Sequence, residues 1–335
     1  MHITRKIVLS NRFNGLPKLE DFAIVEEELP NVLQDGEILC QSEWISVDPY
    51  MRMRASTLNL GDAMIGMQVA RVLKSRCSEY PEGSQVVANF GWVERTVFKP
   101  EAHHGVDTIY KMPDMKGLPD SFALGTVGRP GNTAYFGCLR VCKPKENDTI
   151  VVSAAAGAVG SLVGQIAKIQ GCKILGFAGS DDKVKWLQDK LKFDHAFNYK
   201  TANLSEVFTQ YAPNGIDAYF DNVGGEFTFH VMKHMKPYGK IALCGAISTY
   251  NTDSSQPALV PFDYGSMIYK NITMEGLHVL RWKDEWYTGI NQLRDWILEG
   301  KIVVEETVTQ GFENTPTAFI NMLIGKNVGK AVVKV

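Results

Sequence analysis

A short apolar run that leads directly into a small-residue turn and a helix constrains this 335-residue chain more than any other feature. The run Thr149–Ser153 is rich in β-branched residues, and the turn Ala154–Gly160 contains only alanine, glycine and valine. Beyond it, apolar residues recur at helical spacing at Val159, Leu162, Val163, Ile166 and Ile169. We therefore expect a strand, a tight turn and a helix N-terminus in direct succession.

This order is what a nucleotide diphosphate requires of a protein. Backbone N–H groups at a helix start point toward the phosphates, and small side chains let the backbone approach them closely. Compared with G-x-G-x-x-G, the turn reads Ala155-x-Gly157-x-x-Gly160, with alanine at the first glycine position. The alternative is an ordinary strand–helix turn whose small residues serve packing. The strand before it and the helix after it favour a dinucleotide site.

Strands and helices alternate from Thr149 onward. Strands are expected at 149–153, 173–178, 195–198, 216–221, 240–244 and 272–277, and helices at 159–170, 181–190, 204–211, 226–235 and 285–299. Such alternation predicts right-handed βαβ units and a doubly wound parallel sheet, the Rossmann architecture.

The two ends of the chain lack this alternation. Short extended runs such as Glu37–Cys40 and Gln85–Ala88 lie between clusters of Gly, Pro, Asn and Asp, which is typical of a β-rich domain. After Gly300 we expect a strand at 303–309, a helix at 316–324 and a strand at 331–335. The fold class is therefore α/β with two domains, a β-rich domain formed by residues 1–124 and 306–335, and a nucleotide-binding domain formed by residues 125–305.

Composition excludes several classes of partner. The net charge of −2 shows no basic excess, so neither nucleic acid nor an anionic membrane is expected as the main partner. The chain has no 18-residue apolar run and no signal-like start, so we expect no membrane-spanning segment and a cytoplasmic location. The six cysteines form no C-x-x-C pair and are expected to be reduced, buried thiols.

The end of the second strand favours NADP(H) over NAD(H). Proteins that select NAD usually carry an acid there, about 20 residues after the first glycine position, for the ribose 2′-hydroxyl. Here the strand ends in Gly179-Ser180, and Lys183 follows on the first turn of the next helix. A hydroxyl and a nearby ammonium suit a 2′-phosphate, which a carboxylate would repel. In the alternative interpretation, Asp181 and Asp182 only favour the helix N-terminus and Lys183 is solvated.

Several sequence blocks resemble one known family. They are Val47–Arg52, Leu124–Gly128 with Gly131–Gly137, Ala154–Gly160, Phe197–Lys200, Asp221–Gly225 and Cys244–Asn251. Together they identify the chain as similar to the medium-chain dehydrogenase/reductase superfamily, specifically to its zinc-independent leukotriene B4 12-hydroxydehydrogenase/prostaglandin reductase branch. The resemblance covers essentially the whole chain.

The resemblance implies a GroES-like β domain that binds substrate, a Rossmann domain that binds NADPH or NADP+, an active site in the cleft between them, and a homodimer. For Tyr199 and Asn222 the alternative is ordinary polarity at a strand end. The cofactor contacts that it implies are Thr133, Gly157, Ala158, Val159, Gly160, Lys183, Tyr199, Asn222, Cys244, Gly245, Ala246, Ile247, Ser248, Thr249, Tyr250, Leu277, His278, Val279 and Asn327.

The resemblance also argues against catalytic zinc. Zinc-dependent members of the superfamily use a cysteine near the position of Val47–Asp48 and a Gly-His-Glu block, whereas this chain reads Gly66-Met67-Gln68 there. The cysteine-rich lobe that holds structural zinc is missing as well. Because thiolate and imidazole ligands are absent at these positions, we expect no zinc.

Hydride transfer to an activated double bond needs no metal and no protein nucleophile. Negative charge develops on the carbonyl oxygen of an enone or alkenal, so the protein must donate a hydrogen bond to it. The family residue for this task falls on Tyr269, a phenol that keeps its proton at neutral pH. Tyr50 is expected to contact substrate, and Arg52 either attracts a substrate carboxylate or is structural. The Ser- and Pro-rich stretch 252–264 is expected to be a loop over the site.

The resemblance thus implies an NADPH-dependent enone and 2-alkenal reductase that acts on 15-oxo-prostaglandins and lipid-derived alkenals. NADP+-dependent oxidation of the leukotriene B4 12-hydroxyl is the implied reverse-sense reaction. Two alternatives stay open, an NADPH quinone reductase of the ζ-crystallin type and a non-catalytic NADPH-binding protein.

Overall fold

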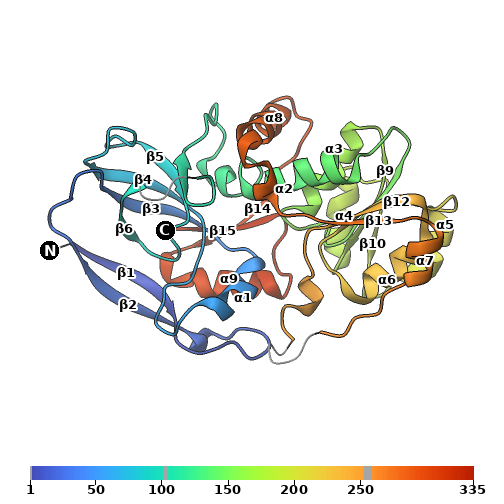
Figure 1. Ribbon diagram of the computed structural model, residues 1–335, viewed down its shortest axis with the longest axis horizontal. Helices are drawn as coiled ribbons and strands as arrows, with labels where there is room; N and C mark the ends of the chain where they lie inside the picture. The colour runs from blue at the N-terminus through green and yellow to red at the C-terminus, as the bar shows by residue number, and fades with distance from the viewer. Residues whose placement is uncertain (1, 101–104, 253–257) are drawn as a thin grey trace. The chain divides into compact units, whose positions relative to one another are not determined.

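The structure, a computed structural model, describes residues 2–100, 105–252 and 258–335 and divides into two compact units (Figure 1). Unit 1 comprises Met1–Gly128 and Glu306–Val335, and unit 2 comprises Arg129–Glu305. Within the described ranges, no helix combines the length and the apolar character needed to cross a bilayer. The predicted α/β class is confirmed.

Unit 2 is built on a six-stranded sheet in which every neighbouring pair is parallel, in the order β10-β9-β8-β11-β12-β13. This is the doubly wound arrangement that the sequence predicts, and its strand order reverses between β8 and β11. The strands are β8 (Thr149–Val152), β9 (Lys173–Ala178), β10 (His195–Asn198), β11 (Ile216–Asp221), β12 (Met235–Leu243) and β13 (Thr273–Gly276).

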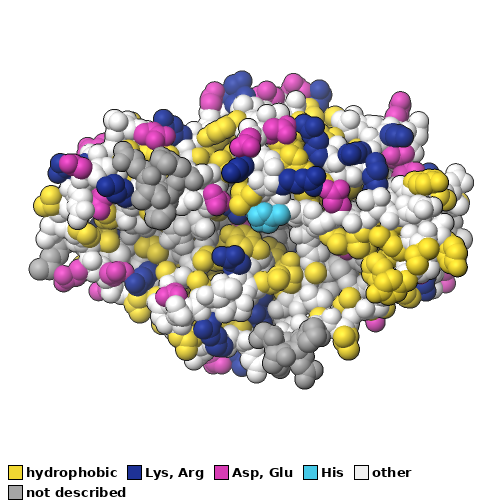
Figure 2. Space-filling view, in the orientation of Figure 1, with side chains coloured by type: hydrophobic (Ala, Val, Ile, Leu, Met, Phe, Trp, Pro, Cys, Tyr) yellow, Lys and Arg dark blue, Asp and Glu magenta, His cyan; other side chains and the backbone are white. Residues whose placement is uncertain are grey.

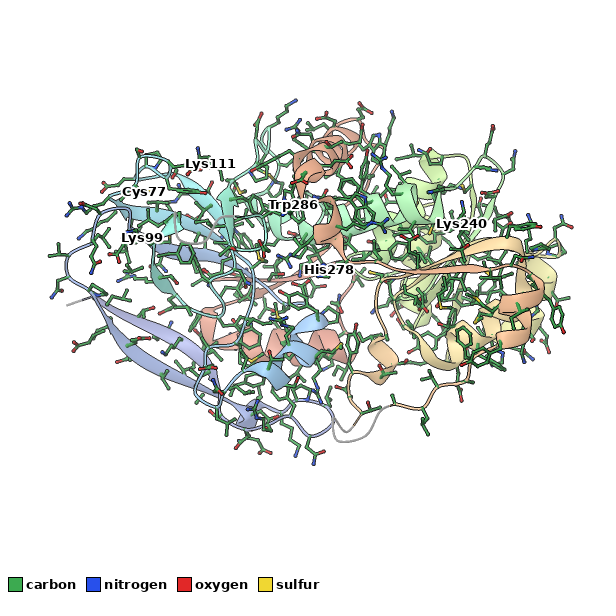
Figure 3. All side chains as sticks on the ribbon, viewed as in Figure 1. Cys77, Lys99, Lys111, Lys240, His278 and Trp286 are labelled. Carbon is green, nitrogen blue, oxygen red and sulfur yellow. The ribbon has the colours of Figure 1, made fainter. Side chains whose placement is uncertain are left out.

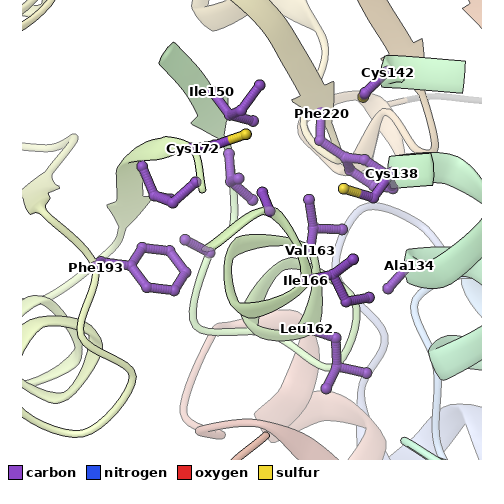
Figure 4. Close-up of a cluster of buried hydrophobic side chains, with 14 of the residues drawn as sticks. Ala134, Cys138, Cys142, Ile150, Leu162, Val163, Ile166, Cys172, Phe193 and Phe220 are labelled. Atoms are coloured by element: carbon purple, nitrogen blue, oxygen red, sulfur yellow. The ribbon is translucent and has the colours of Figure 1, made fainter. Parts of the chain in front are cut away.

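Helices cover both faces of this sheet, and alternate side chains of β8 point to each face. Ile150 and Val152 pack into a core with α2, α3 and α8 (Figure 4), whereas Val151 packs with α5 and α6. The helices are α2 (Arg129–Phe136), α3 (Gly160–Ile169), α4 (Asp181–Asp189), α5 (Leu204–Tyr211), α6 (Gly225–His234), α7 (Tyr264–Tyr269) and α8 (Trp286–Leu298).

Two glycines bring α3 close to the sheet. The ring of Phe193, which is part of the cluster in Figure 4, lies where a Cβ on either glycine would project. A Cβ at Gly164 of α3 would lie 1.9 Å from the Phe193 Cζ, and a Cβ at Gly176 of β9 would lie 2.6 Å from its Cδ2. A larger residue at either position would have to displace the Phe193 ring, which packs against both α3 and β9.

Unit 1 holds a seven-stranded sheet, in which the C-terminal strand β15 lies between β14 and β3. Strands β1 and β2 form a separate antiparallel pair. The strands are β1 (His2–Leu9), β2 (Phe22–Leu29), β3 (Ile38–Ser46), β4 (Gln68–Ser75), β5 (Gln85–Ala88), β6 (Arg95–Phe98), β7 (Ile109–Lys111), β14 (Glu306–Gln310) and β15 (Lys330–Lys334), and the helices are α1 (Tyr50–Arg54) and α9 (Thr315–Leu323).

A buried lysine ties the C-terminal segment to the rest of unit 1. Lys330 is only 3% exposed. Its Nζ lies 3.0 Å from the Asp48 Oδ1 and donates to the carbonyl oxygens of Val47 and Ala331, each at 2.8 Å. The buried ammonium is therefore paired and hydrogen-bonded, which buried charges require.

Helices α1, α2 and α7 lie where the sequence predicts no helix. Helix α2 continues into the π-helix Gly137–Cys142, and α7 lies within the stretch that the sequence assigns to a loop. Pro130, Gly131 and Gly137 obscure the helical pattern of α2 and of the π-helix that follows it. Residues 253–257 of the predicted loop lie outside the described residues.

Candidate functional site

The turn after β8 leaves a helix N-terminus free to meet an anion. Ala154 has a left-handed φ of +47°, and its carbonyl oxygen accepts the N–H of Gly157 at 3.0 Å. A Cβ at Gly160 would lie 2.5 Å from that same oxygen, so only glycine fits the third position of the motif. Within the described chain no side chain caps α3, and the N–H groups of Ser161 and Leu162 donate to the carbonyl oxygens of Gly157 and Val159, each at 3.1 Å. The backbone of 158–160, just before these two residues, is therefore the part of the helix start that is suited to meet a phosphate.

Alanine at the first glycine position is accommodated by a glycine on the neighbouring strand. Ala155 is fully buried and its N–H donates to the carbonyl oxygen of Phe177 at 2.8 Å. A Cβ built on Gly176 would lie 3.2 Å from the Ala155 Cβ. Because Gly176 on β9 has no side chain, there is room for the methyl group of Ala155, and the backbone of the turn can follow the same course as with glycine.

The end of β9 brings together the residues predicted to select NADP(H). Ser180 precedes α4, and the Asp181 carboxylate accepts the Asn198 Nδ2 at 2.9 Å. The half-buried Lys183 stands on the first turn, where burial and the charge of Lys200 lower the pKa of its ammonium. Two lysines this close to one another would stabilise a phosphate dianion bound between them.

Tyr199 lies at the neighbouring strand end. Its N–H donates to the Ala178 carbonyl oxygen at 3.1 Å, and its side chain is 47% exposed. A Cβ at Gly179 would lie 3.3 Å from the Tyr199 Cε1 and 3.5 Å from the Lys200 Cε. The aromatic ring and the second lysine therefore border the tip of β9.

The second half of the sheet places its predicted residues at the same carboxyl edge. The Asn222 Nδ2 donates to the Ser153 carbonyl oxygen at 2.8 Å, which links the loop after β11 to the end of β8. In the segment Cys244–Tyr250, the Tyr250 hydroxyl accepts the Ala246 N–H at 3.2 Å. The Ser248 Oγ donates to the Val223 carbonyl oxygen at 2.6 Å. These bonds hold the two loops after β11 and β12 together.

The segment after β13 alternates buried and exposed side chains. The Leu277 N–H donates to the Leu243 carbonyl oxygen at 2.8 Å, and Leu277 and Val279 are buried. His278 between them is exposed and stands just after β13 (Figure 3). The Thr133 Oγ1 donates within α2 to the Arg129 carbonyl oxygen at 2.9 Å. Asn327 lies in unit 1, where its Nδ2 donates to the Gly329 carbonyl oxygen at 2.8 Å.

Tyr269 is the last residue of α7, and its side chain is 87% exposed. Tyr264 and Ile268 on the same helix are 71% and 66% exposed, and Tyr238 is 75% exposed. Figure 2 shows hydrophobic side chains gathered over this part of unit 2. We call Tyr238, Tyr264, Ile268 and Tyr269 the α7 surface. A phenol in open water is a weak oxyanion stabiliser, because water competes for the same oxygen.

The two predicted substrate residues lie on α1 of unit 1. Tyr50 is its first residue and is half-buried. Arg52 is 7% exposed, and its Nη2 donates to the Gly15 carbonyl oxygen at 2.9 Å. Its guanidinium also lies 5.2 Å from the centre of the Phe13 ring. These contacts favour the structural interpretation of Arg52 over carboxylate recognition.

The residues at the expected zinc-ligand positions are engaged otherwise. The Gln68 Nε2 donates to the carbonyl oxygens of Gly91 and Val93 at 2.5 and 2.8 Å, and Asp48 pairs with Lys330. Across the described ranges, no three His, Cys, Asp or Glu side chains gather as a metal site would require. All six cysteines are free thiols, and five of them are buried.

Comparison with known sequences assigns both parts of the chain. The family described as "N-terminal domain of oxidoreductase" matches residues 5–106, and the family described as "Zinc-binding dehydrogenase" matches residues 158–295. Prostaglandin reductase 1 of Bos taurus is 49% identical over 329 residues, with 97% of each chain covered. The chain belongs to the medium-chain dehydrogenase/reductase superfamily. The resemblance seen in the sequence blocks is thereby confirmed.

Other members of this superfamily are similar over the same length. The NADP(+)-dependent 2-alkenal reductase of Nicotiana tabacum is 38% identical, with 99% of this chain and 97% of the relative covered. CurA of Vibrio vulnificus, solved in complex with NADPH, superposes with a TM-score of 0.91 at 36% identity and covers 99% of each chain. The superfamily fold is thus shared from end to end.

Two residues at this edge have no role in the sequence prediction. Lys200 follows Tyr199 directly, and a second lysine near the end of β9 could have been taken from the sequence as a further indication of phosphate binding. Asp221 ends β11 directly after the apolar run Ala218–Phe220, and an acid that follows such a run at a strand end is a sequence signal that was not used.

Proposed function

We propose that this chain is an NADPH-dependent reductase of the α,β-double bond of enones and alkenals. The observation that carries the proposal is the uncapped N-terminus of α3 above the glycine turn, combined with Lys183 and Lys200 at the tip of β9. The helix N-terminus suits a pyrophosphate, and the two lysines suit a 2′-phosphate. Relatives named for NADP and for alkenal reduction support the same cofactor and reaction.

In this proposal the chain itself binds, orients and donates one hydrogen bond. NADPH, when bound, supplies the hydride that adds to the β-carbon of the substrate. Gly157–Gly160, Asn222 and the segment 244–250 hold the cofactor, and Thr133, Tyr199, Leu277–Val279 and Asn327 complete its contacts. The Tyr269 hydroxyl donates to the carbonyl oxygen as negative charge develops there. Unit 1 supplies substrate contacts through Tyr50, and no zinc takes part.

Within this class we propose 15-oxo-prostaglandins and lipid-derived 2-alkenals as substrates, and NADP+-dependent oxidation of the leukotriene B4 12-hydroxyl as the reverse-sense activity. The prostaglandin reductase 1 and 2-alkenal reductase relatives support this choice. Quinone reduction and cofactor binding without turnover are the competing functions.

A substrate screen tests the function. NADPH oxidation is followed at 340 nm with a 15-oxo-prostaglandin, a 2-alkenal, a simple cyclic enone and a quinone, with NADH in a parallel series. We expect turnover of the first two with NADPH and at least about tenfold lower kcat/KM with NADH. Preferential quinone turnover would replace the proposal with the quinone reductase reading, and NADPH binding without any turnover would replace it with the non-catalytic one.

We further propose that the chain is a homodimer in which the partner covers the α7 surface. Three large side chains there are more than two-thirds exposed, and β13, which follows α7 in the chain, is one of the two edge strands of the unit 2 sheet. Exposed apolar patches and open strand edges are unfavourable in a monomer. A partner at this surface would also exclude water from Tyr269, as its proposed hydrogen bond requires.

The dimer predicts a mass of twice 37.3 kDa in light scattering at micromolar concentration. Ile268→Lys places a charge in the α7 surface and is expected to give the single-chain mass. Val32→Lys is the matched control, because Val32 is equally apolar and 74% exposed but lies in unit 1. A single-chain mass for the unaltered protein, or a dimer that survives Ile268→Lys, would contradict this proposal.

A further inference from the structure

A fully buried aspartate ends β11 at the carboxyl edge of the unit 2 sheet. Asp221 has no exposed surface, and no lysine, arginine or histidine of the described chain lies within ion-pair distance of it. A buried carboxylate without a counter-cation is unfavourable unless several hydrogen-bond donors surround it. Hydrogen-bond donors are therefore expected around the Asp221 carboxylate.

Five donors surround this carboxylate, and the most distant of them is the Ser153 Oγ, 3.5 Å from the Oδ1. The Asp221 Oδ1 accepts the Tyr219 hydroxyl at 2.7 Å, and its Oδ2 accepts the Thr228 hydroxyl at 2.5 Å. The Oδ1 also accepts the backbone N–H groups of Val223 at 2.9 Å and Gly224 at 2.8 Å. Charge-assisted bonds of this kind are the stronger ones, so the carboxylate fixes the course of the loop that follows it.

The loop after Asp221 has an unusual backbone conformation, which these hydrogen bonds stabilise. Gly224 and Gly225 have φ values of +69° and +65°, two consecutive left-handed residues. A Cβ at Gly224 would lie 3.2 Å from the Ala246 Cβ, and one at Gly225 would lie 2.9 Å from the Ser248 Oγ. The Asp221 loop thus packs directly against the predicted cofactor segment after β12.

The same residue reaches the other two loops of the site. Its backbone carbonyl oxygen accepts the N–H groups of Cys244 at 2.8 Å and Gly245 at 3.1 Å. The Tyr219 hydroxyl lies 3.1 Å from the Ser153 Oγ, which accepts the Asn222 N–H at 3.0 Å. Ser153 is the residue immediately before the phosphate-binding turn. The ends of β8, β11 and β12 are therefore connected through one buried network.

We propose that Asp221 is a positioning residue for dinucleotide binding, because its carboxylate holds the loop 222–225 and, through it, both cofactor-binding halves of the unit 2 sheet. The inference rests on the proposed function, since it assumes that this edge binds NADPH. Its location agrees with the rule that ligands of such sheets bind where the strand order reverses, here between β8 and β11. Asp221 need not touch the cofactor to act in this way.

The electrostatics of the edge fit this role. Burial, together with the Asp221 charge, raises the pKa of the Cys244 thiol to about 12, so the thiol stays protonated at neutral pH. The same two causes raise the pKa of Tyr219 well above its ordinary value. Tyr219 therefore keeps its proton at neutral pH and stays a hydrogen-bond donor to Asp221.

Asp221→Asn tests the proposal, with Asp217→Asn as its matched control. Asp217 stands on the same strand, but at its amino end, where it accepts the Thr149 N–H at 2.8 Å and pairs with Lys236 at 2.7 Å. Both variants are expected to lower the melting temperature. Only Asp221→Asn is expected to raise the Kd for NADPH, by at least about fivefold in a fluorescence titration of the folded protein.

Thr228→Val gives a second test, since it removes one donor and keeps the charge. It is expected to raise the Kd less than Asp221→Asn, and it decides the matter if Asp221→Asn does not fold. An unchanged Kd in every folded variant at Asp221 and Thr228, or an equal rise in Asp217→Asn, would overturn the positioning role while NADPH binding by the unaltered chain still stood. Failure of the unaltered chain to bind NADPH would overturn the proposed function and this inference together.

Discussion

Tyr269→Phe is expected to lower kcat for a 15-oxo-prostaglandin or a 2-alkenal by at least about tenfold, because it removes one hydrogen-bond donor from an oxygen that gains negative charge. The Kd for NADPH should stay within about twofold, since the phenol is proposed to act on the substrate. The measurement is steady-state kinetics with NADPH saturating, joined to a direct titration of the cofactor.

Tyr264→Phe is the matched control for this change. Tyr264 lies on the same helix and is 71% exposed, but the proposed chemistry gives its hydroxyl no task. Its removal should leave kcat unchanged. If Tyr269→Phe also leaves kcat unchanged, and a primary isotope effect shows that hydride transfer limits turnover, the catalytic assignment of Tyr269 is wrong.

Lys183→Ala is expected to raise the KM for NADPH by about tenfold or more and to leave the KM for NADH nearly unchanged, because only NADPH carries the 2′-phosphate. Lys185→Ala is the control, an exposed lysine two positions further along α4. An unchanged KM for NADPH in Lys183→Ala would refute the assignment of Lys183 to the 2′-phosphate.

The same lysine gives the cofactor preference a pH dependence. Burial and the neighbouring Lys200 lower the pKa of Lys183, so its ammonium loses the proton at a lower pH than an ordinary lysine does. The KM for NADPH should therefore rise as the pH increases through this lowered pKa, and the KM for NADH should not follow. Lys183→Ala should abolish the difference between the two profiles.

The sequence predicts the unit 2 sheet well because its signals are local. β-Branched runs and helical spacing are read within ten to fifteen residues, and β9, β10, α5 and β11 begin and end where the pattern places them. Helix α2 and the π-helix after it are different. Gly137 lies in the π-helix although glycine has a low helix propensity. A Cβ there would lie 2.5 Å from Leu277 and 2.6 Å from Phe220, so tertiary packing requires glycine at this position.

The candidate site likewise has one part that local sequence patterns predict and one part that depends on tertiary contacts. The turn proposed to bind phosphate is visible in the sequence because its motif lies within the seven consecutive residues 154–160. The Asp221 network is not, since its members come from β8, β11 and α6 and meet only in the folded sheet. The exposure of the Tyr269 side chain depends on which residues pack against α7 in the folded protein, and residue spacing in the sequence does not show this.

The place of Lys330 has a consequence for how the protein is made. Unit 2 is one continuous stretch, so all of it is translated before the segment 306–335 that completes unit 1. Unit 1 cannot close until that segment is present, because β15 is inserted between β14 and β3, and Asp48 lacks the ammonium of Lys330 until then. Residues 1–128 are therefore translated first but gain their last strands only after all of unit 2 has been translated.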